Sequence, residues 1–212
     1  MTVLLTGASR GIGAGLVEAY RAMGEEVIGT TRNGDWPLEV TDAESHRTLA
    51  TRLDGKPIDL LICNAGVYLD KGASLEDGYA PDLWAQTFAT NVTGVFLTVQ
   101  SLLPNLRATS NPRIAIISSI MASHTRAPGG SYIYRSSKAA VLNLGRNLAS
   151  DLHSDRIAVG IYHPGWVVTD MGGAAADITI DASVEGLVAR FEALSLETSG
   201  VFEGWDGNAL PF

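Results

Sequence analysis

Cysteine is almost absent from this sequence, and its absence narrows how the fold can be held together. Among 212 residues there is one cysteine, Cys63. A single cysteine can form no internal disulfide and no cysteine-rich zinc site, so the chain must depend on packing. With no basic leader among the first residues, we expect a protein of the reducing cytoplasm.

Basic residues are also in deficit. The chain has 15 Lys and Arg against 23 Asp and Glu, which gives a formal net charge of -8. Nucleic acids and anionic membranes both select for clustered basic residues, so we expect neither as a partner. No apolar run approaches the roughly 18 residues needed to span a bilayer. The four histidines show no metal-ligand spacing, and we expect no metal.

The residues that are present alternate between two patterns. Short apolar runs predict strands, and apolar residues at helical spacing predict helices. The predicted strands lie at 3–5, 27–31, 58–63, 113–119 and 157–162, and the predicted helices at 16–23, 43–53, 81–106 and 132–152. This alternation predicts an α/β fold, a single Rossmann-type doubly wound parallel sheet with helices on both faces, in one domain over residues 1–212. Ligands of such a sheet bind beyond the carboxyl ends of its strands.

A glycine-rich turn follows the first predicted strand. Gly7, Gly11 and Gly13 let a ligand approach the backbone closely, and the start of the next helix offers unpaired N–H groups. A dinucleotide pyrophosphate fits this arrangement. The spacing departs from the strict G-x-G-x-x-G pattern, because Leu16 occupies the third position. A helix start that simply requires glycines is the alternative interpretation.

Tyr134 and Lys138 stand four residues apart on a predicted helix, so their side chains share one face. At an effective dielectric near 20, a charge about 4 Å away is worth roughly 4 kcal/mol, or about three pK units. The pair therefore predicts a phenol that titrates near neutrality. Tyr and Lys at this spacing are also common on helix surfaces, which is the alternative.

Two serines end the predicted strand at 113–119. A hydroxyl of Ser118 or Ser119 at this position can hydrogen-bond a substrate carbonyl and stabilise charge on its oxygen. Serines that only end a strand or cap a helix are the alternative.

Taken together, these motifs resemble the short-chain dehydrogenase/reductase family. The matching motifs occur in the family's order and cover nearly the whole chain: Thr6 to Gly13, Asn64-Ala65-Gly66, Asn91, Ser119, Tyr134-Arg-Ser-Ser-Lys138 and Pro164-Gly165. Cys63 stands where the family often has a further Asn, and Glu39 stands where Asp is usual beside the adenine.

The resemblance implies a catalytic tetrad. Tyr134 would donate a proton to the carbonyl, and Ser119 would orient the carbonyl oxygen, with Ser118 as the alternative. Lys138 would hold the nicotinamide ribose and lower the pKa of Tyr134. Asn91 would support a water-linked proton relay behind Lys138.

The resemblance also implies the residues that bind the cofactor. Asn64 to Gly66 would flank the adenosine side, and Val167 and Thr169 would hold the carboxamide. The full expected set is Gly7, Ser9, Arg10, Gly11, Ile12, Gly13, Arg32, Glu39, Val40, Asn64, Ala65, Gly66, Tyr134, Lys138, Pro164, Gly165, Val167 and Thr169.

Charge near the second strand predicts the choice of cofactor. A carboxylate there favours NAD(H), and Arg accommodates the 2′-phosphate of NADP(H). The strand ends in Thr30-Thr31-Arg32 without an acid, and Arg10 adds a second cation. We expect NADP(H) to be favoured and NAD(H) to be possible. Ordinary solvated surface arginines are the alternative.

The expected function is hydride transfer between the nicotinamide and a small carbonyl or alcohol substrate. The loop 172–180, with Met121, Tyr132 and Trp166, would wall an apolar pocket. Residues 163–171 are similar to the subgroup that contains sniffer-type carbonyl reductases and the bacterial C-factor, which leaves a cofactor-binding signalling protein as the second hypothesis. An epimerase or dehydratase is third, because it usually needs a longer substrate region. The resemblance also suggests a homodimer or homotetramer.

Overall fold

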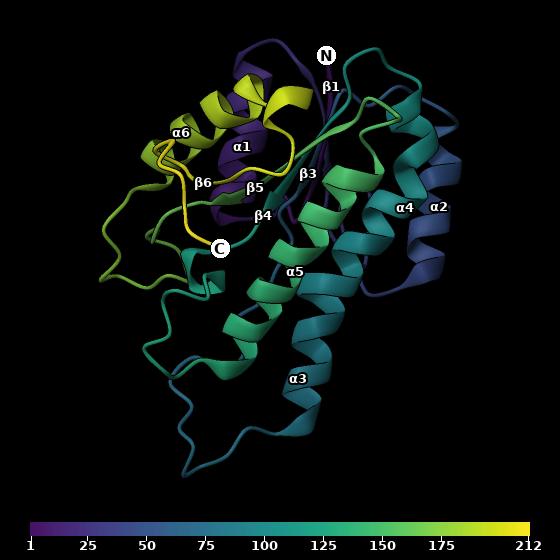
Figure 1. The fold of residues 1–212 in the computed structure, drawn as a ribbon. Coiled ribbons are helices and arrows are strands. Elements are labelled where there is room, and N and C mark those ends of the chain that lie inside the picture. The colour runs from purple at the N-terminus through teal and green to yellow at the C-terminus, as the bar shows by residue number, and fades with distance from the viewer.

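A computed structural model describes all residues from 1 to 212, and its centre is one parallel sheet (Figure 1). The sheet has six strands in the order β2-β1-β3-β4-β5-β6, and every neighbouring pair is parallel. The strands are β1 (Thr2–Thr6), β2 (Glu26–Thr30), β3 (Leu60–Cys63), β4 (Arg113–Ile117), β5 (Ala158–His163) and β6 (Phe202–Gly204). The predicted fold class is confirmed.

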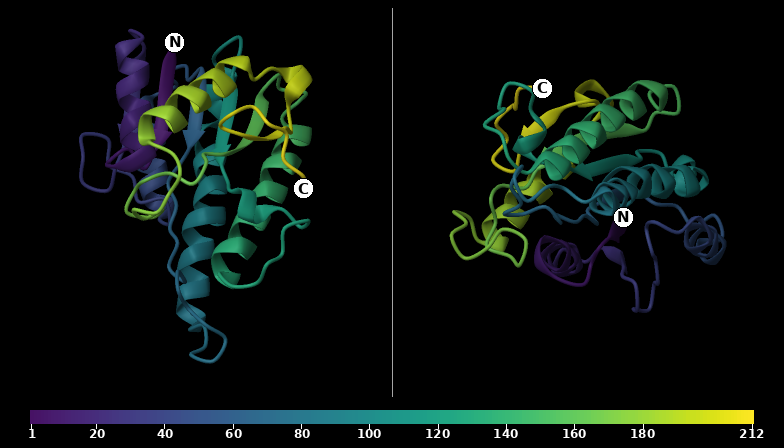
Figure 2. Two further views of the ribbon diagram at one scale, coloured as in Figure 1. Left: turned by 90° about the vertical axis from the view of Figure 1, so that its left-hand side faces the viewer. Right: turned by 90° about the horizontal axis from the view of Figure 1, so that it is seen from below.

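Helices cover both faces of the sheet (Figures 1 and 2). One face carries α1 and α6, which pack against each other, and the other face carries α2, α4 and α5. The helices are α1 (Gly11–Ala22), α2 (Ala43–Leu53), α3 (Pro81–Phe88), α4 (Gly94–Arg107), α5 (Tyr132–Asp151) and α6 (Ile180–Ala193).

Two apolar cores follow from the alternation of side chains along each strand. In β1, Leu4 packs into the core under α2, α4 and α5. Its neighbours Val3 and Leu5 pack into the core under α1 and α6, together with Leu16 and Phe191. Because both faces of the central strands are buried, a strand such as β3 (Leu60–Cys63) is continuously apolar.

The long helix predicted over 81–106 is interrupted in the structure. Between α3 and α4 lies a π-helical segment, Ala89–Thr93. Such π-helical turns occur frequently at functional sites. Helix α6 and strand β6 were not among the predicted elements.

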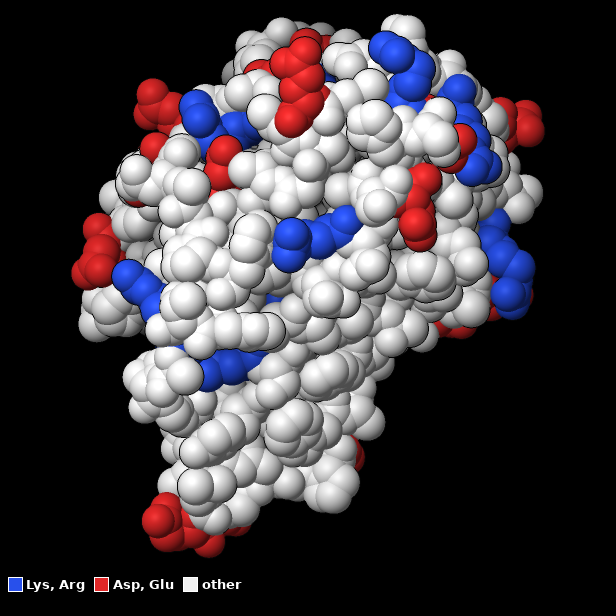
Figure 3. All heavy atoms as spheres, viewed as in Figure 1, with Lys and Arg blue, Asp and Glu red and all other residues white.

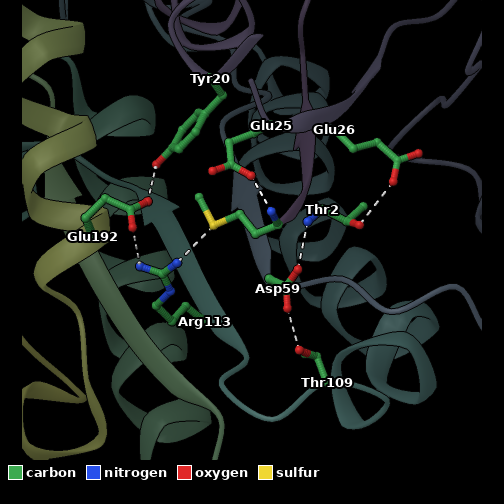
Figure 4. Close-up of polar contacts among 9 residues, drawn as sticks. Thr2, Tyr20, Glu25, Glu26, Asp59, Thr109, Arg113 and Glu192 are labelled. Atoms are coloured by element: carbon green, nitrogen blue, oxygen red, sulfur yellow. Dashed lines mark hydrogen bonds and ion pairs between the residues drawn. The ribbon is translucent and has the colours of Figure 1, made fainter. Parts of the chain in front are cut away.

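A partly buried polar network joins the sheet to α6 at the end opposite the carboxyl ends of the strands (Figure 4). Arg113 begins β4 and donates to the Phe191 carbonyl at 2.8 Å and to the Glu192 carboxylate at 3.2 Å. The Tyr20 hydroxyl donates to the same carboxylate at 3.3 Å. Arg113 therefore connects β4 to the last turn of α6.

None of the helices combines the length and the apolar character that a membrane crossing requires.

Candidate active site

A cavity of about 990 Å³ opens where the strands end at their carboxyl termini. Its lining includes most of the predicted site: Gly7, Ser9, Arg10, Gly11, Ile12, Gly13, Arg32, Glu39, Val40, Asn64, Ala65, Gly66, Tyr134, Lys138, Pro164 and Thr169. The predicted residues Asn91, Ser119, Gly165 and Val167 lie outside that lining. Segments far apart in the chain thus meet at one cavity.

The glycine-rich turn is shaped for close approach. Gly7 and Gly11 have positive φ angles of 73° and 56°, which favour glycine. A Cβ at Gly13 would lie 2.2 Å from the Gly7 carbonyl oxygen. Helix α1 begins after Arg10 with no side-chain cap and no acidic residue in its first turn. Its free N–H groups fit the pyrophosphate of a dinucleotide.

Asn64 holds this turn in place through hydrogen bonds. Its side-chain amide donates to the carbonyls of Thr6 and Gly7 at 3.0 and 3.1 Å. The Thr6 hydroxyl accepts the backbone N–H groups of Asn64 and Ala65. The Asn64 amide therefore connects the end of β1 to the end of β3, and Asn64 also lines the cavity.

The two arginines predicted near the adenosine differ in their surroundings. Arg32 is exposed and lines the cavity. Arg10 forms an ion pair with Asp170 at 2.6 Å, and both side chains are 77% exposed. A 2′-phosphate would therefore compete with Asp170 for Arg10.

Tyr134 and Lys138 are neighbours, as their spacing predicts. Both are buried, and the Lys138 Nζ lies 5.6 Å from the centre of the Tyr134 ring. The ammonium donates to the Ile117 carbonyl at 3.0 Å. Burial lowers the pKa of Lys138 to about 8.

The pKa of Tyr134 differs from the expectation. Burial raises it, and hydrogen bonding with the Ser119 side chain lowers it by less. The expected drop toward neutrality assumed an ammonium about 4 Å away and left burial out. In the folded chain, burial is the larger effect, so the phenol holds its proton.

The two candidate serines are now distinguished by their partners. The Ser118 hydroxyl donates to the Lys138 carbonyl at 3.0 Å and is committed to holding α5 on β4. The Ser119 hydroxyl accepts the Met121 N–H and lies beside the Tyr134 phenol. Geometry therefore favours Ser119, although Ser118 is the one in the cavity lining.

Asn91 lies in the π-helical segment and is almost fully buried. Its amide accepts the Val67 N–H at 2.8 Å and donates to the Val67 carbonyl at 2.9 Å and the Ser137 hydroxyl at 3.0 Å. A Cβ at Gly66 would lie 3.3 Å from the Asn91 Oδ1 and 3.6 Å from the Lys138 Nζ. Asn91 therefore fixes the chain beside Lys138. The proton relay stays a prediction.

The substrate end has only part of the predicted walls. Gly173, Ala174 and Ile180 of the predicted loop 172–180 line the cavity, whereas Met121, Tyr132 and Trp166 do not. Leu69 and Met171 also line the cavity and were not predicted as walls. Tyr68 stacks on Tyr134 with ring centres 4.2 Å apart and planes 19° apart. Tyr68, Leu69 and Met171 come from irregular loops, where no periodicity marks a wall.

Cys63 is fully buried at the end of β3, and burial raises the pKa of its thiol to about 12. The thiol is therefore protonated and unreactive, as expected of a small buried side chain.

Comparison with known proteins gives consistent matches. The family model "short chain dehydrogenase" matches residues 1–178. C-signal of Myxococcus xanthus is 36% identical over 167 residues, covering 78% of this chain and 99% of that protein. The NADPH-bound carbonyl reductase from chicken fatty liver is 32% identical with a TM-score of 0.91, covering 100% of this chain and 98% of the other. The carbonyl reductase Sniffer of D. melanogaster is 26% identical with a TM-score of 0.93, covering 100% and 99%. The predicted resemblance, including its subgroup, is confirmed.

Proposed function

Because the chain belongs to the short-chain dehydrogenase family of oxidoreductases, we propose that it reduces an apolar carbonyl compound to the alcohol with NADPH. The observation that carries this proposal is the buried Tyr134, which lies beside Ser119 and Lys138 at the wall of a cavity of about 990 Å³. A cavity of this size accommodates a dinucleotide together with a small substrate.

The proposed chemistry divides between the cofactor and the chain. When bound, the nicotinamide supplies the hydride. Tyr134, which burial keeps protonated, donates a proton to the carbonyl oxygen, and the Ser119 hydroxyl orients that oxygen. Lys138 holds the ribose hydroxyls with its ammonium. Asn91 anchors the backbone at Val67 on the far side of Lys138 and supports return of the proton through water.

The preference for NADPH rests on charge. Thr30, Thr31 and Arg32 line the cavity where β2 ends, and this stretch of the sequence contains no carboxylate. A guanidinium pairs with a phosphate more strongly than with a ribose hydroxyl. Arg32 therefore favours binding of the 2′-phosphate. Arg10 strengthens this preference when its ion pair with Asp170 opens. NADH would bind more weakly.

The apolar substrate is inferred from the rim of the cavity. Three of the nine exposed large hydrophobic residues of the chain line the cavity: Leu69, Val168 and Met171. Exposed apolar side chains that gather at one place mark a binding site. In Figure 3, the lower part of the molecule, where α3 and the start of α5 project, carries little charge between a basic group and the acidic tip. A bulky apolar aldehyde or ketone suits these walls.

A signalling protein that binds NADPH with little turnover is the second candidate. The similarity to C-signal favours it. Retention of the tetrad residues Asn91, Ser119, Tyr134 and Lys138 favours the enzyme.

We further propose a cytoplasmic location and a homodimer or homotetramer. Location rests on the single buried thiol, which suits a reducing compartment. Assembly rests on family resemblance, and the mass in solution by light scattering would test it.

Two titrations and one assay test the proposed function. We expect NADPH to bind more tightly than NADH by fluorescence titration, and Arg32→Ala to remove most of that difference. A panel of apolar aldehydes and ketones should then be turned over with NADPH. Binding without turnover would support the signalling protein, and no binding of either cofactor would overturn both candidates.

A further inference from the structure

The helix that carries Tyr134 and Lys138 lacks a cap of its own. Ser131 precedes α5 with φ 49° and ψ 42°, in the left-handed region, and its side chain caps no N–H group. The first turn contains no acidic residue. Helix starts need acceptors for their free N–H groups, and an N-cap side chain normally requires an extended backbone.

Asp70 supplies the missing acceptors from a loop 63 residues away in sequence. One carboxylate oxygen accepts the Ile133 N–H at 2.9 Å, and the other accepts the Tyr134 N–H at 3.2 Å. The Asp70 side chain is almost fully enclosed, with 1% of the residue exposed. A buried carboxylate with both oxygens on a helix start is a strong, directional anchor.

The neighbours of Asp70 complete the arrangement around Tyr134. Tyr68 stacks on the Tyr134 ring, and its hydroxyl is hydrogen-bonded to the Ser131 hydroxyl. Lys71 turns the other way and donates to the Met171 and Gly172 carbonyls at 3.0 and 3.3 Å. Tyr68 and Asp70 therefore contact the catalytic helix, and Leu69 and Lys71 contact the cavity and the substrate loop.

We propose that Asp70 is a positioning residue for Tyr134: its buried carboxylate fixes the first turn of α5 and so places the phenol for proton donation. The proposal rests on the proposed function, because it concerns the same reaction. Tyr134 is bonded to Asp70 through its own N–H, so a shift of the carboxylate moves the phenol directly. Misplacement of a catalytic group by a fraction of an ångström slows a reaction strongly.

Asp70 also acts through its charge. The titratable and charged groups facing the Tyr134 phenol are Tyr68 and Asp70 from the loop and Lys138 from α5, with the Ser119 hydroxyl beside them. The negative charge of Asp70 raises the pKa of Tyr134, in the same direction as burial. Asp70 therefore helps to keep the phenol protonated, which suits reduction of a carbonyl.

Asp70→Asn tests the positioning. An amide is neutral and accepts only one of the two N–H groups well. We expect kcat for carbonyl reduction to fall by about tenfold or more, with the NADPH dissociation constant and the substrate KM nearly unchanged. Asp77→Asn, on an exposed carboxylate of the same loop, should leave kcat at its wild-type value.

Asp70→Glu is the second variant, and it tests the positioning role of Asp70 if Asp70→Asn does not fold. The longer side chain keeps the charge and displaces the oxygens. We expect a lower kcat with the substrate KM nearly unchanged. Wild-type kcat in either folded variant would overturn the proposal.

Amide hydrogen exchange separates this proposal from the proposed function. It needs no substrate or turnover. In the wild type, the Ile133 and Tyr134 amides should be protected, and in Asp70→Asn their exchange should accelerate by at least about tenfold relative to the rest of α5. Unchanged exchange would contradict the anchor even if the enzyme reduces carbonyls. Failure of the wild type to reduce any carbonyl would contradict only the proposed function.

Discussion

Tyr134 and Lys138 are adjacent on α5, and burial shifts their pKa values in opposite directions. It raises the pKa of the phenol and lowers that of the ammonium to about 8. At neutral pH both groups therefore hold a proton. The spacing of the pair could be predicted from sequence. The direction of the phenol shift could not, because burial depends on the loops packed over the helix.

Gly13 provides a test of the cofactor turn. A Cβ at this position would lie 2.2 Å from the Gly7 carbonyl oxygen, which is backbone and cannot yield. We expect Gly13→Ala to lower the free energy of unfolding by about 1–3 kcal/mol and to abolish NADPH binding in a fluorescence titration. Gly24→Ala is the matched control, since a Cβ there meets no atom although φ is +81°. It should lose some stability and bind NADPH normally, and equal binding by both variants would refute the close-approach argument.

His163 makes stability depend on pH. Burial lowers its pKa from 6.5 to about 4, and its Nδ1 has no hydrogen-bond partner. The unfolded chain binds a proton below pH 6.5 that the folded chain resists until about pH 4, so stability falls over this interval. The loss attributable to His163 is roughly 3 kcal/mol by the pK conversion. Urea titrations at several pH values should show a shallower acid loss in His163→Gln, and identical curves would contradict the assignment.

At the scale of elements, the hydrophobic pattern predicted helices and strands best where their apolar residues pack against the core. The helix at 43–53 was predicted with the boundaries that α2 has, and the strands at 3–5 and 27–31 lie within or overlap β1 and β2. Helix α6 and strand β6 were missed. The short β6, Phe202–Gly204, carries too few residues to show an alternating pattern.

Loop 67–80 is the largest element-scale omission. It provides Tyr68, Asp70 and Lys71, which contact the catalytic helix and the substrate loop. No turn motif or periodicity identifies such contacts, because they join residues about 60 to 100 positions apart. The π-helical turn at Asn91 is likewise invisible to periodicity, since it inserts into an otherwise helical pattern.

The loop after β5 is connected to the cofactor turn by the Arg10–Asp170 ion pair. Both side chains are 77% exposed, and such pairs are worth about 0.2–1 kcal/mol. If Asp170 competes with the 2′-phosphate for Arg10, Asp170→Asn should tighten NADPH binding by about 1.4- to 5-fold, which is the same energy converted to affinity. NADH binding should not change. A tightening of both cofactors alike, measured by fluorescence titration, would contradict the competition.

At the scale of the whole molecule, function and stability lie at opposite ends of the sheet. The cavity occupies the carboxyl ends of the strands, and the Arg113 network occupies the other end (Figure 4). The doubly wound arrangement predicted that the ligand site lies at the carboxyl ends of the strands. It could not predict the Arg113 network, because no strand pattern indicates that a buried arginine pairs with α6.

This separation predicts that stability can be lost without loss of the site. Arg113→Ala leaves the buried Phe191 carbonyl without its donor and leaves the Glu192 carboxylate with the Tyr20 hydroxyl as its remaining partner. We expect the free energy of unfolding in urea to fall by about 1–3 kcal/mol, with the NADPH dissociation constant unchanged while the chain is folded. Arg107→Ala removes an exposed ion pair with Asp155 and should cost less than about 1 kcal/mol. Equal losses in the two variants would show that the network is not a stabilising element.

The central claim is that Tyr134 is the proton donor of an NADPH-dependent carbonyl reductase, and Tyr134→Phe tests it most directly. The measurement is the rate of NADPH consumption with an apolar aldehyde, at saturating cofactor, for the wild type and this variant. Removal of one buried hydroxyl should leave the fold and the NADPH dissociation constant intact while lowering kcat by about 10²-fold or more. A Tyr134→Phe enzyme that binds NADPH and turns over at the wild-type rate would contradict the account.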